Sequence, residues 1–254
     1  MGPVTSKTNR LLETLPAADY RALGLFFERV KLPLGHTLYG CGKRIDYAYL
    51  PIDSVVSFLH PTEDGSTVEV GIVGNDGLVG ITVCLGGTSM PHRAVVCIGG
   101  EALRMPTARL VNEFNSRAFL RSGVLRYAQS FLTQISQTAV CNRLHPVEKR
   151  LCRTLLLCHD RVPSNDFSMT LEFLSSMLGG RRESVTVAAG GLQNAGVIRY
   201  SRGRIYILDR QGLEASACEC YQLISHEYPR LVSADKKPTL PAPPAEDSLS
   251  ARLA

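Results

Sequence analysis

The chain has 254 residues, 44% of them apolar, and its 28 Lys and Arg against 23 Asp and Glu leave a net charge of +5. That much apolar side chain can fill a buried core, which excludes a wholly disordered chain and predicts one or two domains. No apolar run approaches the roughly 18 residues of a membrane-spanning helix, and the N-terminus contains no signal-peptide core. We therefore expect a cytoplasmic protein.

Residues 33–105 carry short β-rich runs separated by turn signals such as Glu63-Asp64-Gly65 and Asn75-Asp76-Gly77. The predicted strands are residues 48–50, 54–59, 67–73, 81–85, 93–98 and 102–105. Many short strands at this spacing predict a small antiparallel barrel or jelly roll. A helix is expected before it, near residues 16–30.

A heptad repeat begins after Glu113, where apolar residues recur every seven positions at Ala118, Leu125, Leu132 and Ala139. Ala128 and Ile135 occupy the alternate position, which Arg121 interrupts. Such a repeat is typical of a seam between two helices, so we predict a dimerisation helix over residues 113–142. The alternative is a single long helix packed on its own domain.

The positive charge lies in the following part of the chain. Residues 141–210 contain 11 Lys and Arg against 6 Asp and Glu, so this segment holds the whole excess of +5. A neutral front and a basic rear indicate a sensing or scaffolding part joined to a part that binds a polyanion.

Two helices joined by a glycine turn are predicted within this basic segment. Thr170 can cap a helix over residues 171–178, and Gly179 and Gly180 suit a tight turn at its end. A second helix over about residues 182–194 buries apolar side chains at helical spacing, namely Val185, Ala189 and Leu192. This arrangement predicts a helix-turn-helix that can read DNA.

The start of the second helix carries side chains suited to DNA. Arginine can donate two hydrogen bonds to guanine, glutamate can accept one from cytosine, and a helix N-terminus favours phosphate. We therefore expect DNA contacts from Arg181, Arg182, Glu183, Ser184, Thr186 and Val187.

A basic hairpin is predicted next, with strands over residues 197–200 and 204–208 joined by Ser201-Arg202-Gly203. A hairpin in this place is typical of a winged domain. Phosphate contacts supply affinity without sequence information, and we expect them from Arg199, Arg202 and Arg204.

Gly190 and Gly191 conflict with the second helix, because each costs about 1 kcal/mol relative to alanine inside a helix. Either another backbone passes close to them or the helix ends early.

The segment LEFLSSMLGGRRESVTVAAGGLQNAGVIRYSRGRIYILD, residues 171–209, resembles the winged helix-turn-helix of the Crp/Fnr superfamily of bacterial transcription regulators. The likeness is specific over about residues 146–221. It is looser over residues 33–140, where the strand spacing, the region 71–80 and the long helix resemble a cyclic-nucleotide-binding-like β-roll with its dimerisation helix.

The resemblance implies an α+β fold with an N-terminal antiparallel β-roll (jelly-roll-like), a long dimerisation helix and a C-terminal winged helix-turn-helix. The corresponding segments are a sensor domain over residues 1–112, the helix over 113–142 and a DNA-binding domain over 143–222. Residues 223–254 are expected to form a disordered tail, because the chain beyond Ser233 is rich in proline and has no apolar periodicity.

The resemblance also implies a homodimer that binds a pseudo-palindromic operator, senses an effector and contacts RNA polymerase. Arg182 and Glu183 correspond to the family's base-reading pair, whereas Val187 stands where a second arginine is often found. The resemblance therefore does not fix the preferred DNA sequence.

Cyclic AMP is not expected to be the effector. Where cyclic-nucleotide responders have a glutamate that binds the ribose, the segment Gly77-Leu78-Val79-Gly80 has Leu78. Arg93 remains the candidate for binding an anionic effector. Only Cys41 precedes Cys84, so the family's N-terminal iron–sulfur cluster is not expected, and we predict no cofactor. Haem stays an alternative, with three histidines available as ligands: His36, His60 and His92.

The chain has eight cysteines, and no two of them form a Cys-x-x-Cys pair. This argues against a zinc ribbon or a thioredoxin-type redox pair. Most of the cysteines are therefore expected to be reduced packing residues. Cys218-Glu219-Cys220 with His226 nearby offers metal ligands, but their spacing matches no standard structural site. We therefore predict no metal.

Two other functions compete with transcription regulation. An enzyme has little support, because the chain has no Gly-x-Ser-x-Gly motif, no phosphate-binding loop and no metal-spaced histidine pair. A ligand-sensing or protein-interaction module without sequence-specific DNA binding is the second alternative.

Overall fold

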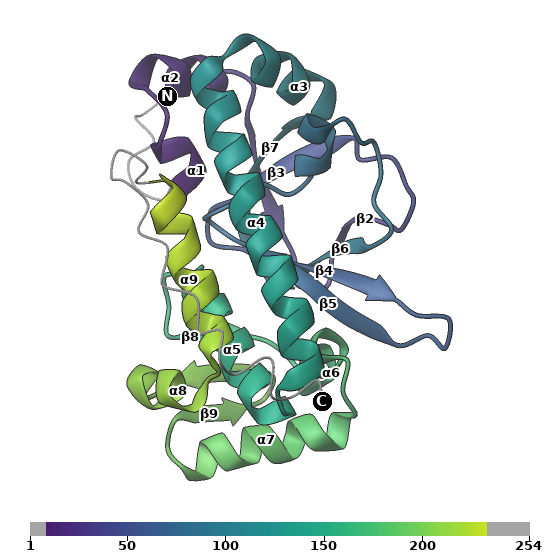
Figure 1. Ribbon diagram of the computed structural model, residues 1–254, viewed down its shortest axis with the longest axis vertical. Helices are drawn as coiled ribbons and strands as arrows, with labels where there is room; N and C mark the ends of the chain where they lie inside the picture. The colour runs from purple at the N-terminus through teal and green to yellow at the C-terminus, as the bar shows by residue number, and fades with distance from the viewer. Residues whose placement is uncertain (1–8, 233–254) are drawn as a thin grey trace, which may run out of the picture.

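The computed structural model describes residues 9–232, in which helix α4 (Ala118–Leu144) runs beside an N-terminal β-roll and ends at a C-terminal winged domain (Figure 1). The N-terminal part contains, in chain order, α1 (Arg10–Glu13), α2 (Ala17–Gly24), β1 (Glu28–Leu32), β2 (Thr37–Tyr39), β3 (Tyr47–Pro51), β4 (Val55–Pro61), β5 (Thr67–Val73), the 3-10 helix η1 (Ile81–Leu85), β6 (Arg93–Ile98), β7 (Gly100–Pro106) and α3 (Thr107–Ser116). The predicted α+β fold class is confirmed, with N-terminal antiparallel sheets, a long helix and a C-terminal helix-turn-helix.

Two antiparallel sheets form the β-roll, one in the order β1-β7-β3 and the other in the order β2-β6-β4-β5. Alternation along β4 divides its side chains between two cores. Val56 and Phe58 face the interior of the roll, whereas Val55 and Leu59 face the C-terminal domain. Because both faces of β4 are buried, the winged domain is held firmly against the sheet.

Two sequence predictions for the N-terminal part are wrong. Residues 81–85 form the 3-10 helix η1 rather than a strand, because the flanking glycines Gly80 and Gly86 are both in the left-handed conformation, with φ of 89° and 90°. The helix expected near residues 16–30 ends at Gly24, and the residues from Glu28 onward form strand β1, which pairs with β7. Tertiary pairing thus overrode local helix propensity.

The long helix begins later than predicted. Residues 113–116 belong to α3, and Arg117, whose backbone is extended, separates α3 from α4. The Arg117 guanidinium binds Glu113 at 2.6 Å and Asp19 at 2.8 Å, which fixes the break between α3 and α4. Helix α4 then continues without interruption to Leu144.

The C-terminal part contains α5 (Val147–His159), β8 (Asp166–Ser168), α6 (Leu171–Leu178), α7 (Arg182–Asn194), β9 (Ile198–Ser201), β10 (Arg204–Ile207), α8 (Arg210–Ser216) and α9 (Glu219–Val232). The prediction of a disordered tail is wrong for residues 223–232, which belong to α9, and residues 233–254 lie outside the described part of the chain. Helix α9 packs lengthwise against α4 (Figure 1). Within residues 9–232, no helix is long and apolar enough to cross a membrane.

Helix α7 continues through Gly190 and Gly191 to Asn194, so it does not end early. A Cβ atom built at either glycine meets nothing within 4 Å, so no neighbouring backbone demands glycine there. Both explanations that the sequence suggested are therefore wrong, and the two glycines weaken the helix without a packing reason.

We expect Gly190→Ala and Gly191→Ala each to raise the free energy of unfolding by about 0.5–1 kcal/mol, because alanine restricts the unfolded chain and fits the open helix surface. Gly179→Ala is the matched control. Its φ of +57° and a Cβ position 3.1 Å from Val68 Cγ2 predict destabilisation. Urea titration would measure all three, and a loss of stability at position 190 or 191 would contradict the expectation.

Candidate DNA interface

The helix-turn-helix is built from α6, α7 and the turn between them. The Thr170 hydroxyl accepts a hydrogen bond from the Phe173 N–H at 3.1 Å, which caps α6. Gly179 ends the helix in the left-handed conformation, and the Arg150 guanidinium donates to the Leu178 carbonyl at 3.0 Å. Buried side chains join the two helices, among them Leu174, Met177, Val185 and Ala188.

The outer face of α7 is open. All six residues expected to contact DNA are exposed, namely Arg181, Arg182, Glu183, Ser184, Thr186 and Val187. Over residues 9–232, no ion pair engages Arg181, Arg182 or Glu183, so their charges are available to a ligand. The Thr186 hydroxyl donates a hydrogen bond to the Arg182 carbonyl of the same helix at 2.9 Å. The helix therefore presents its charged side chains at its N-terminal end.

The wing is the hairpin of β9 and β10. Ser201 pairs with Arg204, and the two residues between them, Arg202 and Gly203, have φ of 50° and 74°. Two positive φ values in a two-residue loop are typical of a type I′ turn, a conformation in which asparagine followed by glycine is usual. Arg202 is the one non-glycine residue with positive φ among the described residues, and its exposed side chain stands at the tip of the wing.

The other two wing arginines are engaged within the domain. Arg199 lies over the Tyr206 ring, with its guanidinium carbon 4.3 Å from the centroid. Arg204 forms a close ion pair with Asp166 on β8. A hydrogen bond from the Ser164 hydroxyl lowers the pKa of Asp166, and Arg204 lowers it further. Arg202 is therefore the wing arginine most open to phosphate.

Helix α4 has three faces, of which two contact other parts of the chain and one is exposed. Val124, Tyr127 and Phe131 pack into the roll. Thr133 and Gln137 contact α9, through hydrogen bonds to Glu227 and Cys220. The third face is exposed and carries one row of the predicted seam, namely Ala118, Leu125, Leu132 and Ala139.

The second row of the predicted seam lies elsewhere. Ala128 is buried in the core of the roll and Ile135 packs partly against it, so the expectation that Ala128 faces a partner is wrong. The positions that flank the exposed row are Ser122, Gln129 and Ser136. The free face of α4 therefore combines leucine and alanine with small polar side chains.

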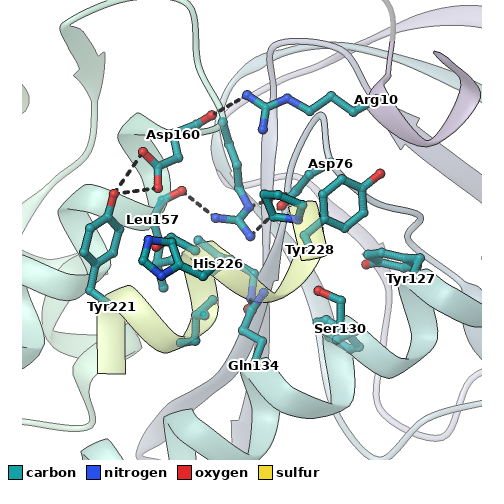
Figure 2. Close-up of a pocket in the computed structure, with 16 residues that line it drawn as sticks. Arg10, Asp76, Tyr127, Ser130, Gln134, Leu157, Asp160, Tyr221, His226 and Tyr228 are labelled. Atoms are coloured by element: carbon teal, nitrogen blue, oxygen red, sulfur yellow. Dashed lines mark hydrogen bonds and ion pairs between the residues drawn. The ribbon is translucent and has the colours of Figure 1, made fainter. Parts of the chain in front are cut away.

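A cavity of about 250 Å³ lies where the roll, α4, the end of α5 and α9 meet (Figure 2). Tyr127, Ser130 and Gln134 of α4 border it, opposite Tyr221, His226 and Tyr228 of α9, as Figure 2 shows. Its volume is below the roughly 300 Å³ at which pockets for drug-sized ligands begin.

A buried ion pair links the two domains beside this cavity. Arg161, after α5, binds Asp76 in the loop after β5 at 2.7 Å and donates to the Leu157 carbonyl at 2.8 Å. Burial lowers the pKa of Arg161, but the charges of Asp76 and Asp160 more than offset this and raise it. A Cβ at Gly74 would lie 2.5 Å from the Arg161 side chain, so glycine allows this close approach. The sequence offered no signal for this junction.

The region expected to bind an effector is filled by the protein itself. Leu78 is buried in the apolar core, and a Cβ at Gly77 would lie 2.5 Å from the Tyr127 ring. In the roll, Phe58 stacks on His92 with centroids 4.7 Å apart and meets Phe131 edge-on at 5.5 Å. Arg93 is exposed at the start of β6.

One group in the described part of the chain could hold a metal. It consists of Cys141, His145, Cys218 and Cys220. The histidine that sequence proximity suggested, His226, lines the cavity instead. The four-residue spacing of Cys141 and His145 was the signal available in the sequence, but nothing local connected it to a segment more than 70 residues away.

Residues 149–216 match the Crp-like helix-turn-helix domain family. Comparison with curated protein sequences gave no match. Among solved structures, FixK2 from Bradyrhizobium japonicum is similar with a TM-score of 0.64 and 16% identity, over 76% of this chain and 98% of that one. A CRP-family transcriptional regulator from Thermus thermophilus is similar with a TM-score of 0.62 and 19% identity, over 75% of this chain and 96% of that one. A putative crp/fnr-family regulator from Eubacterium rectale is similar with a TM-score of 0.61 and 15% identity, over 81% of this chain and 96% of that one.

A β-roll, a long helix and a winged helix-turn-helix with an exposed basic helix start make up the fold found in these DNA-binding transcription regulators. The chain carries the Crp-like helix-turn-helix domain and has the fold of the Crp/Fnr regulators, so the resemblance that its sequence indicated is confirmed.

Proposed function

We propose that the protein is a homodimeric transcription regulator that binds a pseudo-palindromic operator through α7, senses an effector through its N-terminal domain and contacts RNA polymerase. The observation that carries the proposal is the start of α7, where Arg182 and Glu183 are exposed and free of internal ion pairs within the described chain. The tip of the wing adds a further free cation, Arg202.

Mobility-shift titration with a fragment of the protein's own promoter region tests this proposal. A salt-sensitive shift that an unrelated fragment cannot compete away supports it. Binding that is equal for all fragments, or no binding, would favour the alternative of a sensing or interaction module without sequence-specific DNA binding.

The wing is expected to supply affinity rather than specificity. Arg202→Ala should weaken binding to all sequences alike and reduce the slope of log K against log salt by about one unit, because one phosphate contact is lost. Alanine is also strained at the φ of 50°, so Arg202→Asn is the necessary companion, since asparagine tolerates this conformation. Wild-type affinity in Arg202→Asn would show that turn geometry, not charge, explains the alanine result.

Cyclic AMP and cyclic GMP are expected not to bind with functional effect. Leu78 cannot accept a hydrogen bond from a ribose hydroxyl, and a buried polar group without a partner costs about 1–3 kcal/mol. A ligand in this region would also have to displace the aromatic contacts that Phe58 makes with His92 and Phe131. Calorimetric titration, with operator affinity measured alongside, tests this. Micromolar binding coupled to tighter DNA binding would contradict it.

A further inference from the structure

We propose that Cys141, His145, Cys218 and Cys220 form a four-ligand site for one thiophilic divalent cation, with zinc the ion that this donor set favours. The inference does not depend on DNA binding. The site joins the last turn of α4 to the start of α9, two elements that are far apart in the sequence.

The positions of the donor atoms carry the proposal. The Cys141 and Cys218 Sγ atoms are 3.6 Å apart, and the Cys220 Sγ is 3.5 Å from His145 Nδ1. All four donor atoms lie within 4.8 Å of one another. Tetrahedral zinc with bonds of about 2.3 Å to sulfur and about 2.1 Å to nitrogen requires edges of about 3.8 Å and about 3.6 Å. The observed spacing therefore suits a single ion.

Local structure explains how the ligands converge. Cys141 lies in the last turn of α4, and His145 is the residue that caps the helix, with its backbone N–H donating to the Cys141 carbonyl at 3.1 Å, so the two residues are held close together. Cys218 precedes the first turn of α9 and Cys220 lies within it, where the positive end of the helix dipole favours thiolates. Packing of α9 on α4 then brings the two pairs together.

The surroundings provide the outer contacts that a metal site needs. His145 Nε2 lies 3.3 Å from a Glu219 carboxylate oxygen, so this carboxylate can fix the ring with Nδ1 directed at the metal. The Gln137 amide donates to Cys220 Sγ at 3.2 Å. A cluster of cysteines that served only as apolar packing would need neither contact.

The charge balance provides a second argument. Three thiolates, one neutral imidazole and a divalent cation carry one net negative charge, which requires a cation nearby when buried. Arg153 is only 1% exposed, and its charge reaches both Cys141 and the buried carboxylate of Glu69. Its Nη1 donates to the Thr138 hydroxyl at 3.0 Å, its Nε has no partner, and no carboxylate of the described residues lies within 4.0 Å of it. An anionic metal centre would therefore add to Glu69 in balancing the charge of this buried arginine.

Four protein ligands leave no open coordination position, so the site is structural rather than catalytic. The ion would clamp α9, and with it the end of the winged domain, to the helix that runs along the roll. Metal binding should therefore raise the melting temperature of the full chain.

Anaerobic titration of the reduced, chelator-stripped full chain with cobalt(II) tests the site. We expect one equivalent to bind, with intense visible bands of tetrahedral cobalt and a thiolate charge-transfer band, both lost on addition of zinc(II). Cys220→Ser should weaken binding at least 100-fold. Cys41→Ser, which removes an exposed cysteine elsewhere, should leave the spectrum unchanged.

Two further variants keep the test decisive if Cys220→Ser does not fold. His145→Cys should retain tetrahedral binding with a stronger charge-transfer band, and Glu219→Gln should weaken binding about tenfold. Weak octahedral binding, a spectrum insensitive to position 145, or a Cys141–Cys218 disulfide that resists reduction would overturn the proposal.

Discussion

Arg182→Ala is expected to cost about 1–3 kcal/mol of binding free energy at the preferred operator half-site and to relax the preference for one G·C pair. Arg182 is exposed at the first position of α7, and no ion pair in the described chain occupies its guanidinium. It can therefore donate two parallel hydrogen bonds to guanine. Binding-site selection followed by titration on the selected site would measure both effects.

Two controls separate base reading from charge. Arg182→Lys keeps the charge but cannot form the same forked pair, so it should lose specificity while retaining most of the nonspecific affinity. Arg21→Ala removes one exposed positive charge from α2 in the N-terminal part of the chain and should leave the consensus unchanged. An unaltered consensus and affinity in Arg182→Ala would show that α7 is not the reading helix.

Leu125→Arg combined with Leu132→Arg is expected to produce monomers and to reduce operator affinity by about 1000-fold or more, because one winged domain alone covers a single half-site. The two leucines are 46% and 58% exposed on the free face of α4, one heptad apart. Neither contacts the roll core, so the folded monomer should survive. Sedimentation would report the mass, and footprinting should show half-sites about 34 Å apart for the wild type.

The matched control is Leu25→Arg with Leu85→Arg, which changes two exposed leucines outside α4. This variant should remain dimeric. Dimers that survive the α4 substitutions would move the interface to another face of the molecule. Monomers in both variants would instead indicate a general effect of added charge.

Local signals in the sequence were sufficient for the helix-turn-helix and its wing. A capping threonine, a left-handed glycine and apolar residues at helical spacing act within a few residues of one another, so Thr170, Gly179 and Val185 marked the elements that the structure contains. The hairpin was equally local, because Arg202 and Gly203 form a two-residue turn between directly paired strands. Such features depend on backbone preferences rather than on distant packing.

Only the tertiary structure decided which faces are covered. The heptad pattern marked Ala128 and Leu125 alike, yet the roll buries Ala128 and leaves Leu125 free, since the register of α4 on the sheet selects the face. The interdomain pair of Arg161 and Asp76 and the meeting of Cys141 with Cys218 join residues 85 and 77 positions apart. Such contacts form only when several elements pack together, and no local preference of the chain encodes them.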